Sequence, residues 1–447
     1  MVSPSSPDQT RSIIRRVLLG QLLFSAGHAL TTGGFLNYFA NPFFQGFAVA
    51  LAVMQVTPEA AESLAVVTRW LVIRWGGRKT VWWVSLLLAR LAALAIPGLV
   101  YAGMVPGTAG AIPAIIGLLA IWYLLQGVSY TAYLSWLSDL VPEVQWGNLL
   151  ARRSMAISLV TVCMTYNAAA IFDRTKLWPA GDKFHAYIVL FGLGGALCLA
   201  SILPLIGLRA GGRVSRDESA RDGQGCPSYI TPSLWQSIRP QLQLAFSDQV
   251  FRRFLFGCWQ LSFFQGLTQT AQFQFSANVL KVSQLDYYGM LSVMLLLQIP
   301  LAGLAGWLVD GGHDRKIMVG GLVGLSLAMG CWWMATWYGP AWLLAAYVVW
   351  GLFGMVNVAQ PSLGLKLAPR SDNSVQLSLF RQIGGLLAAL AGMLGGLVLD
   401  HYSQKGGLPP LEVFRWLFIV SGVGRATAAL WFWKTRAPGE GASAQAG

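Results

Sequence analysis

Charge is scarce in this 447-residue sequence. Only 11% of its residues are Asp, Glu, Lys or Arg, whereas 55% are hydrophobic. A soluble domain carries about 25% charged residues, so this chain has too little charge to cover a soluble surface of its size. The 19 Trp, 22 Phe and 50 Gly agree, because aromatic residues anchor at bilayer interfaces and glycine is frequent in membrane helices. The composition therefore indicates a membrane protein.

Cysteine and histidine are also rare, with 5 Cys and 4 His. The cysteine spacing resembles neither a disulfide framework nor a metal site. His185, His313 and His401 are scattered on expected loops, without the cluster of acids, bases or metal ligands that a membrane enzyme needs. The sequence also lacks a Gly-x-x-x-x-Gly-Lys-Ser/Thr phosphate loop, which argues against ATP-driven transport. We therefore expect no cofactor, no metal and no enzymatic activity.

Long apolar runs are abundant. A membrane-spanning helix needs ~20 mostly apolar residues, and the sequence contains twelve such runs, which are too long and continuous for the strands of a membrane β-barrel. They cover residues 17–39, 47–72, 81–102, 112–137, 154–173, 186–208, 253–279, 287–309, 317–338, 341–365, 378–399 and 411–433. The expected fold class is an all-α membrane protein with twelve transmembrane helices.

The positions of the basic residues predict the orientation. With a cytoplasmic N-terminus, most of the 31 Lys and Arg fall on cytoplasmic connections, as the positive-inside rule requires. The net charge of +13 is then a topology signal that also suits contact with anionic lipid, so nucleic-acid binding is not needed to explain it. We expect a multi-pass protein of the cell (inner) membrane with both termini cytoplasmic, acting as a monomer.

The longest polar stretch, residues 209–251, predicts a boundary between two halves. Residues 1–208 and 252–447 would each hold six helices, joined by a cytoplasmic linker. The linker's second part, SLWQSIRPQLQLAF, has apolar residues at helical spacing, which favours an amphipathic segment on the membrane surface. A solvated linker with a few chance apolar residues is the alternative.

The two halves resemble each other, which indicates duplication. In the fourth apolar run, Gly127 is followed fifteen residues later by Pro142, through GVSYTAYLSWLSDLVP. In the tenth, Gly354 is followed fifteen residues later by Pro369, through GMVNVAQPSLGLKLAP. A shared pattern at matching places in two six-helix halves is typical of transporters that are built from repeats.

Two cytoplasmic turns carry a related motif. The turn after the second run reads RWGGRK, and the turn after the eighth reads GWLVDGGHDRK. These turns resemble the Gly-x-x-x-Asp-Arg-x-Gly-Arg-Arg/Lys motif of the major facilitator superfamily of secondary transporters. The matching residues are Gly77, Arg78 and Lys79 in the first half and Gly306, Asp310, Arg315 and Lys316 in the second. The first turn departs from the family at Trp70 and Arg74, where the family has the glycine and the aspartate.

This resemblance implies two pseudo-symmetric six-helix bundles, with helices one, four, seven and ten around a central cavity. Polar residues in the corresponding runs are then the candidates for substrate contact, and inter-helix hydrogen bonding is the alternative role. Three glutamines of the seventh run share one helical face. The candidates are Asn37, Tyr130, Tyr133, Gln265, Gln269, Gln272, Asn357 and Gln360.

Two glutamates, Glu59 and Glu62, stand out inside the second run. Counting 1.5 Å per residue from the connecting turns puts Glu62 level with Arg90 and Glu59 level with His28. A charge in the bilayer centre costs at least ~2.5–3.5 kcal/mol, so pairing is expected. Because arginine does not titrate, we interpret Glu62 and Arg90 as a structural ion pair. Glu59 and His28 are candidates for proton coupling, since histidine changes charge near neutral pH, and a structural tie is equally open.

These observations predict a secondary active transporter that moves a small polar organic solute by alternating access, with proton coupling as the first hypothesis. An uncoupled facilitative carrier and a drug or metabolite exporter of the same fold are alternatives. A membrane enzyme and a non-transporting sensor are the rivals from other classes. The expected partners are a small-molecule substrate, protons and the lipid bilayer.

Overall fold

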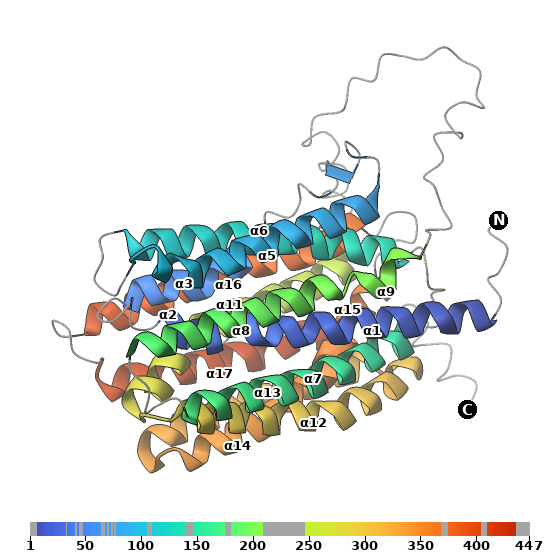
Figure 1. Cartoon of the computed structure of the whole chain (residues 1–447). Coiled ribbons are helices and arrows are strands. Elements are labelled where there is room, and N and C mark those ends of the chain that lie inside the picture. The colour runs from blue at the N-terminus through green and yellow to red at the C-terminus, as the bar shows by residue number, and fades with distance from the viewer. Residues whose placement is uncertain are drawn as a thin grey trace, which may run out of the picture.

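The helices run side by side along one axis and form a slab of membrane-spanning size (Figure 1). This computed structural model describes residues 7–32, 34–40, 43, 48–63, 68, 71–72, 75, 77–104, 110–138, 146–174, 180–208, 246–367, 374–403 and 409–434. Arg69, Trp70, Arg74 and the linker segment 209–245 lie outside the described residues, and so does the side chain of Glu62.

The helices of the first half form one group of neighbours. Their bounds are α1 (Pro7–Thr31), α2 (Gly34–Ala40), α3 (Ala48–Ser63), α5 (Arg78–Tyr101), α6 (Ala111–Ser138), α7 (Trp146–Arg174), α8 (Ala180–Ala200) and α9 (Leu203–Ile206). Neighbours in this group include α5 and α6, α1 and α8, and α1 and α7.

The helices of the second half are grouped around α11 and α13. Their bounds are α11 (Gln249–Gln274), the π-helical η5 (Phe275–Val279), α12 (Gln284–Asp310), α13 (Asp314–Tyr338), α14 (Ala341–Trp350), α15 (Phe353–Leu367), α16 (Ser374–Tyr402) and α17 (Leu411–Trp433). Close neighbours here are α11 with α16 and α17, and α13 with α17.

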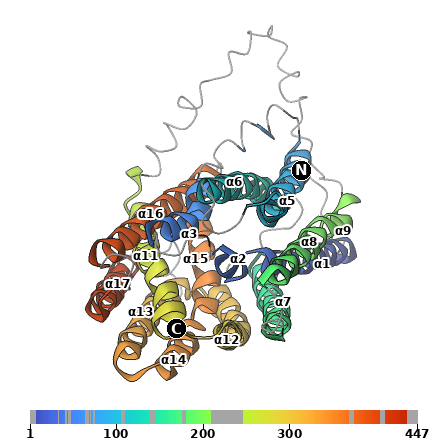
Figure 2. The same ribbon diagram turned by 60° about the vertical axis from the view of Figure 1, so that its left-hand side comes forward.

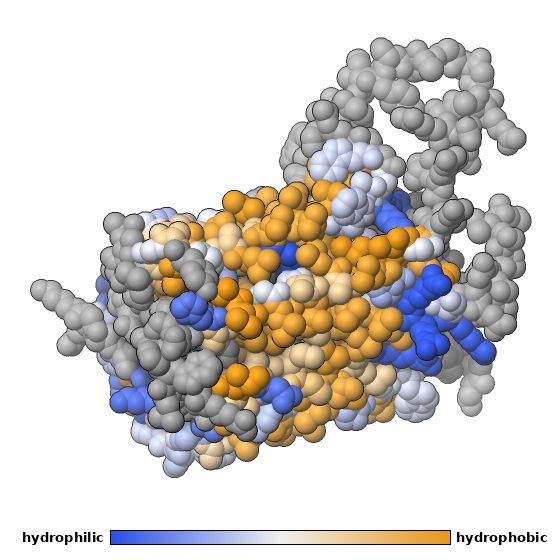
Figure 3. Space-filling view, in the orientation of Figure 1, coloured by the Kyte–Doolittle hydropathy of each residue, from blue (hydrophilic) through white to orange (hydrophobic). Residues whose placement is uncertain are grey.

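The all-α prediction is confirmed. Nine helical segments of the described chain are long and apolar enough to cross a membrane, and α1, α3 and α11 supply the other three expected spans. On the face shown in Figure 3, a broad belt of hydrophobic residues covers the middle, and hydrophilic residues gather most densely near the end where α1 begins. This distribution suits a protein that is surrounded by lipid.

Three of the expected spans are interrupted among the described residues. The first divides at Thr32 into α1 and α2, the sixth at Ser201 and Ile202 into α8 and α9, and the tenth at Gly351 and Leu352 into α14 and α15. Thr31 and Thr32 donate their hydroxyls to the carbonyl of His28, at 3.3 and 2.7 Å, which offers the backbone an alternative to the helical ladder. The break at Gly351 lets Gly354 approach the backbone of Gln298, where a β-carbon would lie 2.6 Å from the carbonyl oxygen.

The buried side chains follow the division into two halves. One large core cluster contains residues between 251 and 432, and a smaller one contains first-half residues between 17 and 208. A third cluster belongs mainly to the first half but includes Phe273 and Tyr288 of the second. Figure 2 shows the halves meeting where α3 lies beside α16 and α12 beside α7. The boundaries at 208 and 252 stay a prediction.

Candidate functional site: a central polar cavity

A cavity of about 350 Å³ lies in the first half of the molecule and reaches the second half at Gln269. Its wall comes from α1, α2, α3 and α6 of the first half and from α11 of the second. The lining residues are His28, Thr32, Leu36, Asn37, Met54, Gln55, Pro58, Glu59, Tyr123 and Gln269. The cavity thus combines amides, hydroxyls, one imidazole and one carboxylate with a few apolar side chains.

Local irregularities in two helices position this wall. The break between α1 and α2 leaves His28 and Thr32 on one side and Asn37 on the other, all facing the same space. In α3, Pro58 lacks a backbone N–H, so the ladder bond to the carbonyl of Met54 cannot form. Pro58 and Glu59 both line the cavity, as expected from their adjacent positions in the sequence.

His28 and Glu59, the candidates for proton coupling, lie on the wall of this one cavity. The imidazole of His28 stacks on the ring of Phe24, with 5.5 Å between the ring centroids. Its Nδ1 is buried and has no hydrogen-bond partner among the described residues. A role of the two residues in proton coupling stays a prediction.

The other candidates for substrate contact are divided among several environments. Asn37 and Gln269 line the central cavity. Gln272 turns toward α13, where its amide donates to Met329 Sδ at 3.7 Å, and Gln265 is half-buried. Gln360 hydrogen-bonds the thiol of Cys258, and Asn357 is exposed. Tyr130 and Tyr133 line a second, smaller cavity inside the first half.

Two lining residues, Gln55 and Tyr123, were missed by sequence reasoning. Gln55 precedes Glu59 by four residues, and residues at this spacing share a helical face. That spacing was the signal that could have added Gln55 to the predicted site. No comparable spacing to a predicted lining residue marks Tyr123.

Arg90 is fully buried in the first half and is held by several groups. Its Nη2 donates a short hydrogen bond to Gln126 Oε1, and its guanidinium lies over the rings of Phe24 and Trp122, at 5.4 and 5.7 Å from their centroids. The predicted partner, Glu62, has its side chain outside the described residues, so the ion pair stays a prediction. The aromatic contacts add a structural support that the sequence did not reveal.

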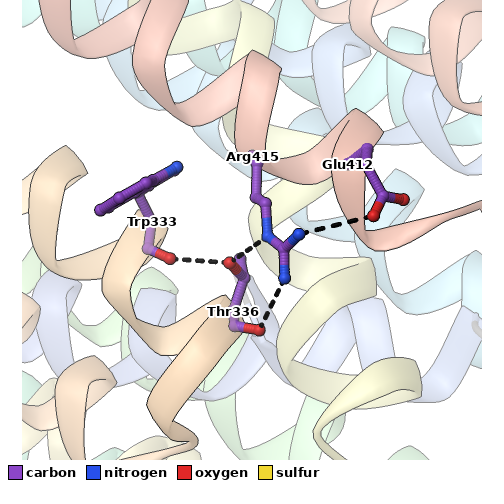
Figure 4. A network of polar contacts seen from close by, with 4 residues as sticks. All are labelled: Trp333, Thr336, Glu412 and Arg415. Atoms are coloured by element: carbon purple, nitrogen blue, oxygen red, sulfur yellow. Dashed lines mark hydrogen bonds and ion pairs between the residues drawn. The ribbon is translucent and has the colours of Figure 1, made fainter.

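Two arginines of α17 lie in the second half, away from the cavity lining. Arg425 is buried and donates to Ser421 Oγ and Thr268 Oγ1, both at 3.1 Å. Arg415 donates to Thr336 Oγ1 at 2.9 Å and pairs with Glu412 at 3.4 Å (Figure 4). Both arginines join α17 to neighbouring helices, which is a structural role.

Comparison with known proteins identifies the family. The family model described as Major Facilitator Superfamily matches residues 17–392. This chain belongs to the major facilitator superfamily. The predicted family and the twelve-helix fold are therefore confirmed, and the chain is a multi-pass secondary transporter for a small-molecule substrate.

Solved structures of superfamily transporters share this fold over nearly the whole chain. The inward-open xylose transporter XylE from E. coli has a TM-score of 0.66 and 15% identity, covering 96% of this chain and 97% of that chain. A variant of the nucleoside transporter NupG has a TM-score of 0.63 and 13% identity, covering 96% and 99%. A bacterial homologue of the human lysosomal transporter Spinster, facing inward, has a TM-score of 0.62 and 15% identity, covering 96% and 97%. No curated protein sequence matches the chain.

The superfamily motif of the first half joins two helix ends. Lys79 Nζ donates to the carbonyl of Leu208 at 3.1 Å and, by a short bond, to that of Ile206, at the end of α9. The ammonium also lies 5.8 Å from the ring centroid of Trp136. A cation at the carbonyl end of a helix satisfies unpaired acceptors and the helix dipole. Gly77 and Arg78 lie in the same turn, at the start of α5.

The motif of the second half contains a contact that the sequence comparison did not predict. Asp310 is exposed, whereas the buried Asp314 pairs with Lys366 of α15 at 2.6 Å. Lys366 also donates to the carbonyl of Val309 at 3.0 Å. Arg315 and Lys316 follow at the start of α13. The ion pair therefore ties α15 to the turn between α12 and α13, a long-range contact that a local motif cannot reveal.

Aromatic residues join the two superfamily halves next to the cavity. Phe35 of α2 stacks on Tyr288 of α12, with 4.7 Å between the ring centroids. Tyr38 of α2 meets Phe273 of α11 at 5.8 Å and Tyr287 of α12 at 6.2 Å. We call these five residues the aromatic closure. It connects the halves at the α2 end of the molecule, opposite the end where α1 begins (Figure 1).

Proposed function

We propose that this chain carries a small polar organic solute through the central cavity by alternating access. The observation that carries the proposal is the position of this polar cavity, which lies in the first half and is bounded on one side by Gln269 of the second half. In a protein built from two repeats, a site between them can open to either side as the halves rock. The contacts of α3 with α16 and of α7 with α12 are suitable surfaces for such rocking.

The lining supports a neutral solute that bears hydroxyl or amide groups. Asn37, Gln55 and Gln269 each carry an amide that can donate and accept hydrogen bonds, and Thr32 and Tyr123 add hydroxyls. Leu36, Met54 and Pro58 supply an apolar surface for the carbon skeleton. The cavity volume of about 350 Å³ is within the usual range of small-molecule sites.

Proton coupling through Glu59 is the favoured form of this proposal. A carboxylate that faces a cavity with alternating access can take a proton on one side of the membrane and release it on the other. His28 shares the cavity and is the second candidate for carrying the proton. An uncoupled facilitative carrier and an exporter of the same fold are the alternatives.

The proposed setting is the cell (inner) membrane, with both termini cytoplasmic and the protein acting as a monomer. The excess of basic residues on the expected cytoplasmic connections supports this orientation. In this orientation the aromatic closure lies at the outer end of the molecule. Residues 209–251 would then link the two halves on the cytoplasmic side.

The first experiment identifies the solute and then tests the coupling. Purified protein is screened for thermal stabilisation by D-xylose and other monosaccharides and by nucleosides, because XylE and NupG are xylose and nucleoside transporters. The stabilising solute is then followed into reconstituted vesicles, with and without a pH gradient. We expect the gradient to drive accumulation, and Glu59→Gln to abolish that accumulation while solute binding remains.

The matched control is Glu412→Gln, which removes an exposed carboxylate on α17. It should leave accumulation unchanged. Uptake that is indifferent to both the gradient and Glu59→Gln would establish the facilitative alternative. Solute binding without any flux would favour a sensor, and chemical conversion of the solute would favour an enzyme.

A further inference from the structure

A second cavity, of about 40 Å³, lies inside the first half, apart from the central one. By the ~10–15 Å³ that one water needs, it has room for about three water molecules. Polar side chains from three helices reach it: Gln21 of α1, Gln126, Tyr130 and Tyr133 of α6, and Arg153 of α7. We call this space the Arg153 cavity.

The guanidinium of Arg153 has more donors than good acceptors. Its Nε donates to Gln21 Oε1 at 2.9 Å, a normal hydrogen bond. Both terminal nitrogens share one weak acceptor, because each lies 3.5 Å from the hydroxyl of Tyr130. Nitrogen–oxygen hydrogen bonds are usually 2.7–3.2 Å long. Among the described residues, the planar fork of terminal N–H groups, which fits an anion, therefore has no acceptor at a normal hydrogen-bond distance.

The charge of Arg153 is also without a described counter-charge. The ion pairs that join described residues are Asp314 with Lys366 and Glu412 with Arg415, and neither includes Arg153. Its described neighbours are neutral amides, phenols and the ring of Tyr130, at 5.4 Å from the guanidinium carbon. A cation inside a helix bundle normally has a partner of opposite sign.

A second cation strengthens the positive potential at this place. Gln126, which lines the Arg153 cavity, accepts a hydrogen bond from the fully buried Arg90 through its Oε1. This contact leaves the amide N–H groups of Gln126 as donors. The cavity thus has two guanidinium groups near it and a neutral amide donor in its wall.

We propose that the Arg153 cavity binds a small monovalent anion of the size of a halide or a carboxylate group. The terminal N–H groups of Arg153 would hold the anion in bidentate fashion. The bound anion would bridge α1, α6 and α7, so it would stabilise the packing of the first half. The site is separate from the proposed solute site, because the two cavities share no lining residue.

The test measures thermal unfolding of the purified protein as chloride or formate replaces gluconate at constant ionic strength. We expect a saturable rise in the melting temperature with each small anion, because binding to the folded state stabilises it by mass action. Arg153→Gln should remove the rise, and Arg153→Lys, which keeps the charge but loses the fork, should raise the midpoint concentration about tenfold. Arg253→Gln, which removes an arginine from the surface of α11, should keep the wild-type response.

The same titrations distinguish a free ion from the carboxylate of a transported solute. Stabilisation by chloride and formate alone identifies a free ion. Stabilisation by a larger carboxylate such as lactate only, lost in both Arg153→Gln and Gln269→Ala, would identify a solute that reaches both cavities and would overturn the separate anion site. Absence of a saturable response in the wild type, or the same response in Arg153→Gln, would overturn the proposal.

A direct measurement does not depend on how the variants fold. Crystals of the wild-type protein soaked in bromide should show an anomalous peak within hydrogen-bond distance of the terminal nitrogens of Arg153. A carboxylate from residues 139–145 at that position would overturn the proposal, because the protein would then supply its own counter-charge.

Discussion

At the scale of single residues, Arg90 shows how an interior cation is supported by stacking. Both of the rings that face it, Phe24 and Trp122, belong to neighbouring helices of the first half. A planar guanidinium can lie flat on such rings and still donate to Gln126 in its own plane. The ammonium group of lysine is not planar, so it cannot stack on the rings and donate to Gln126 at the same time.

We therefore expect Arg90→Lys to destabilise the protein although it conserves the charge. Lysine cannot stack on the two rings and places its donor differently toward Gln126, so the free energy of unfolding should fall by about 2–3 kcal/mol. Thermal unfolding of the purified variant, compared with the wild type, measures this loss. Arg253→Lys is the control, because Arg253 lies at the surface and its change should stay within about 0.5 kcal/mol. Equal melting temperatures of Arg90→Lys and the wild type would show that only the charge matters at this position.

The residues of the central cavity show which side chains the sequence could place. His28 and Glu59 were selected because a charge or an imidazole is unusual in an apolar run, and counting residues along adjacent helices put them level. The structure places both on one wall. Tyr130 and Gln272 are equally suitable for substrate contact by their chemistry. A polar side chain on a membrane helix, however, can face either the cavity or a neighbouring helix. Which of the two it faces depends on the rotation of each helix, which is set by packing and not by local sequence.

At the scale of elements, α16 is positioned by glycines that let other backbones approach it. A β-carbon on Gly395 would lie 2.2 Å from the carbonyl oxygen of Leu267 in α11, and one on Gly392 would lie 2.2 Å from Cγ1 of Val56 in α3. Glycines three or four residues apart, as Gly392 and Gly395 are, are typical of helices that pack closely in a membrane. Through these contacts α16 touches both halves.

Gly395→Ala should destabilise the second half. The added methyl group meets a backbone oxygen that can move only with its helix, and such overpacking costs about 1–3 kcal/mol. The control is Gly330→Ala on α13, where a β-carbon has no heavy atom within 4 Å. That variant should be neutral or more stable by up to ~1 kcal/mol, because alanine favours the helix. Similar melting temperatures for the two variants would contradict the tight α11–α16 contact.

The existence of the helices could be predicted, but their interruptions could not. A run of ~20 apolar residues has few alternatives in a membrane, so the expected spans and the observed helices agree. The break between α14 and α15 accompanies the close approach of Gly354 to Gln298 in α12. Such a long-range contact leaves no local trace beyond a glycine, and glycine is common in membrane helices for other reasons.

At the scale of the whole molecule, the contacts between the halves are of two kinds. Along α3 with α16 and α7 with α12, helices pack over much of their length. At the α2 end, by contrast, the five residues of the aromatic closure meet across the halves in ring contacts, between Phe35 and Tyr288 and around Tyr38. Ring contacts can separate without breaking a hydrogen-bonded ladder. If the halves rock, the aromatic closure is therefore the contact that must open at this end.

Fixing the aromatic closure should stop transport without removing the solute site. In a background with the native cysteines replaced by serine, Phe35→Cys and Tyr288→Cys are combined and joined by a short, reducible thiol cross-linker. We expect the linked protein to lose at least about 90% of its solute flux in vesicles, because one of the two openings is blocked. Solute-induced thermal stabilisation should persist, since the cavity lining is unchanged, and a reductant should restore the flux. Each single-cysteine variant, treated in the same way, should keep its flux. A linked protein that still transports at the wild-type rate would show that the α2 end need not open, and alternating access through this closure would be wrong.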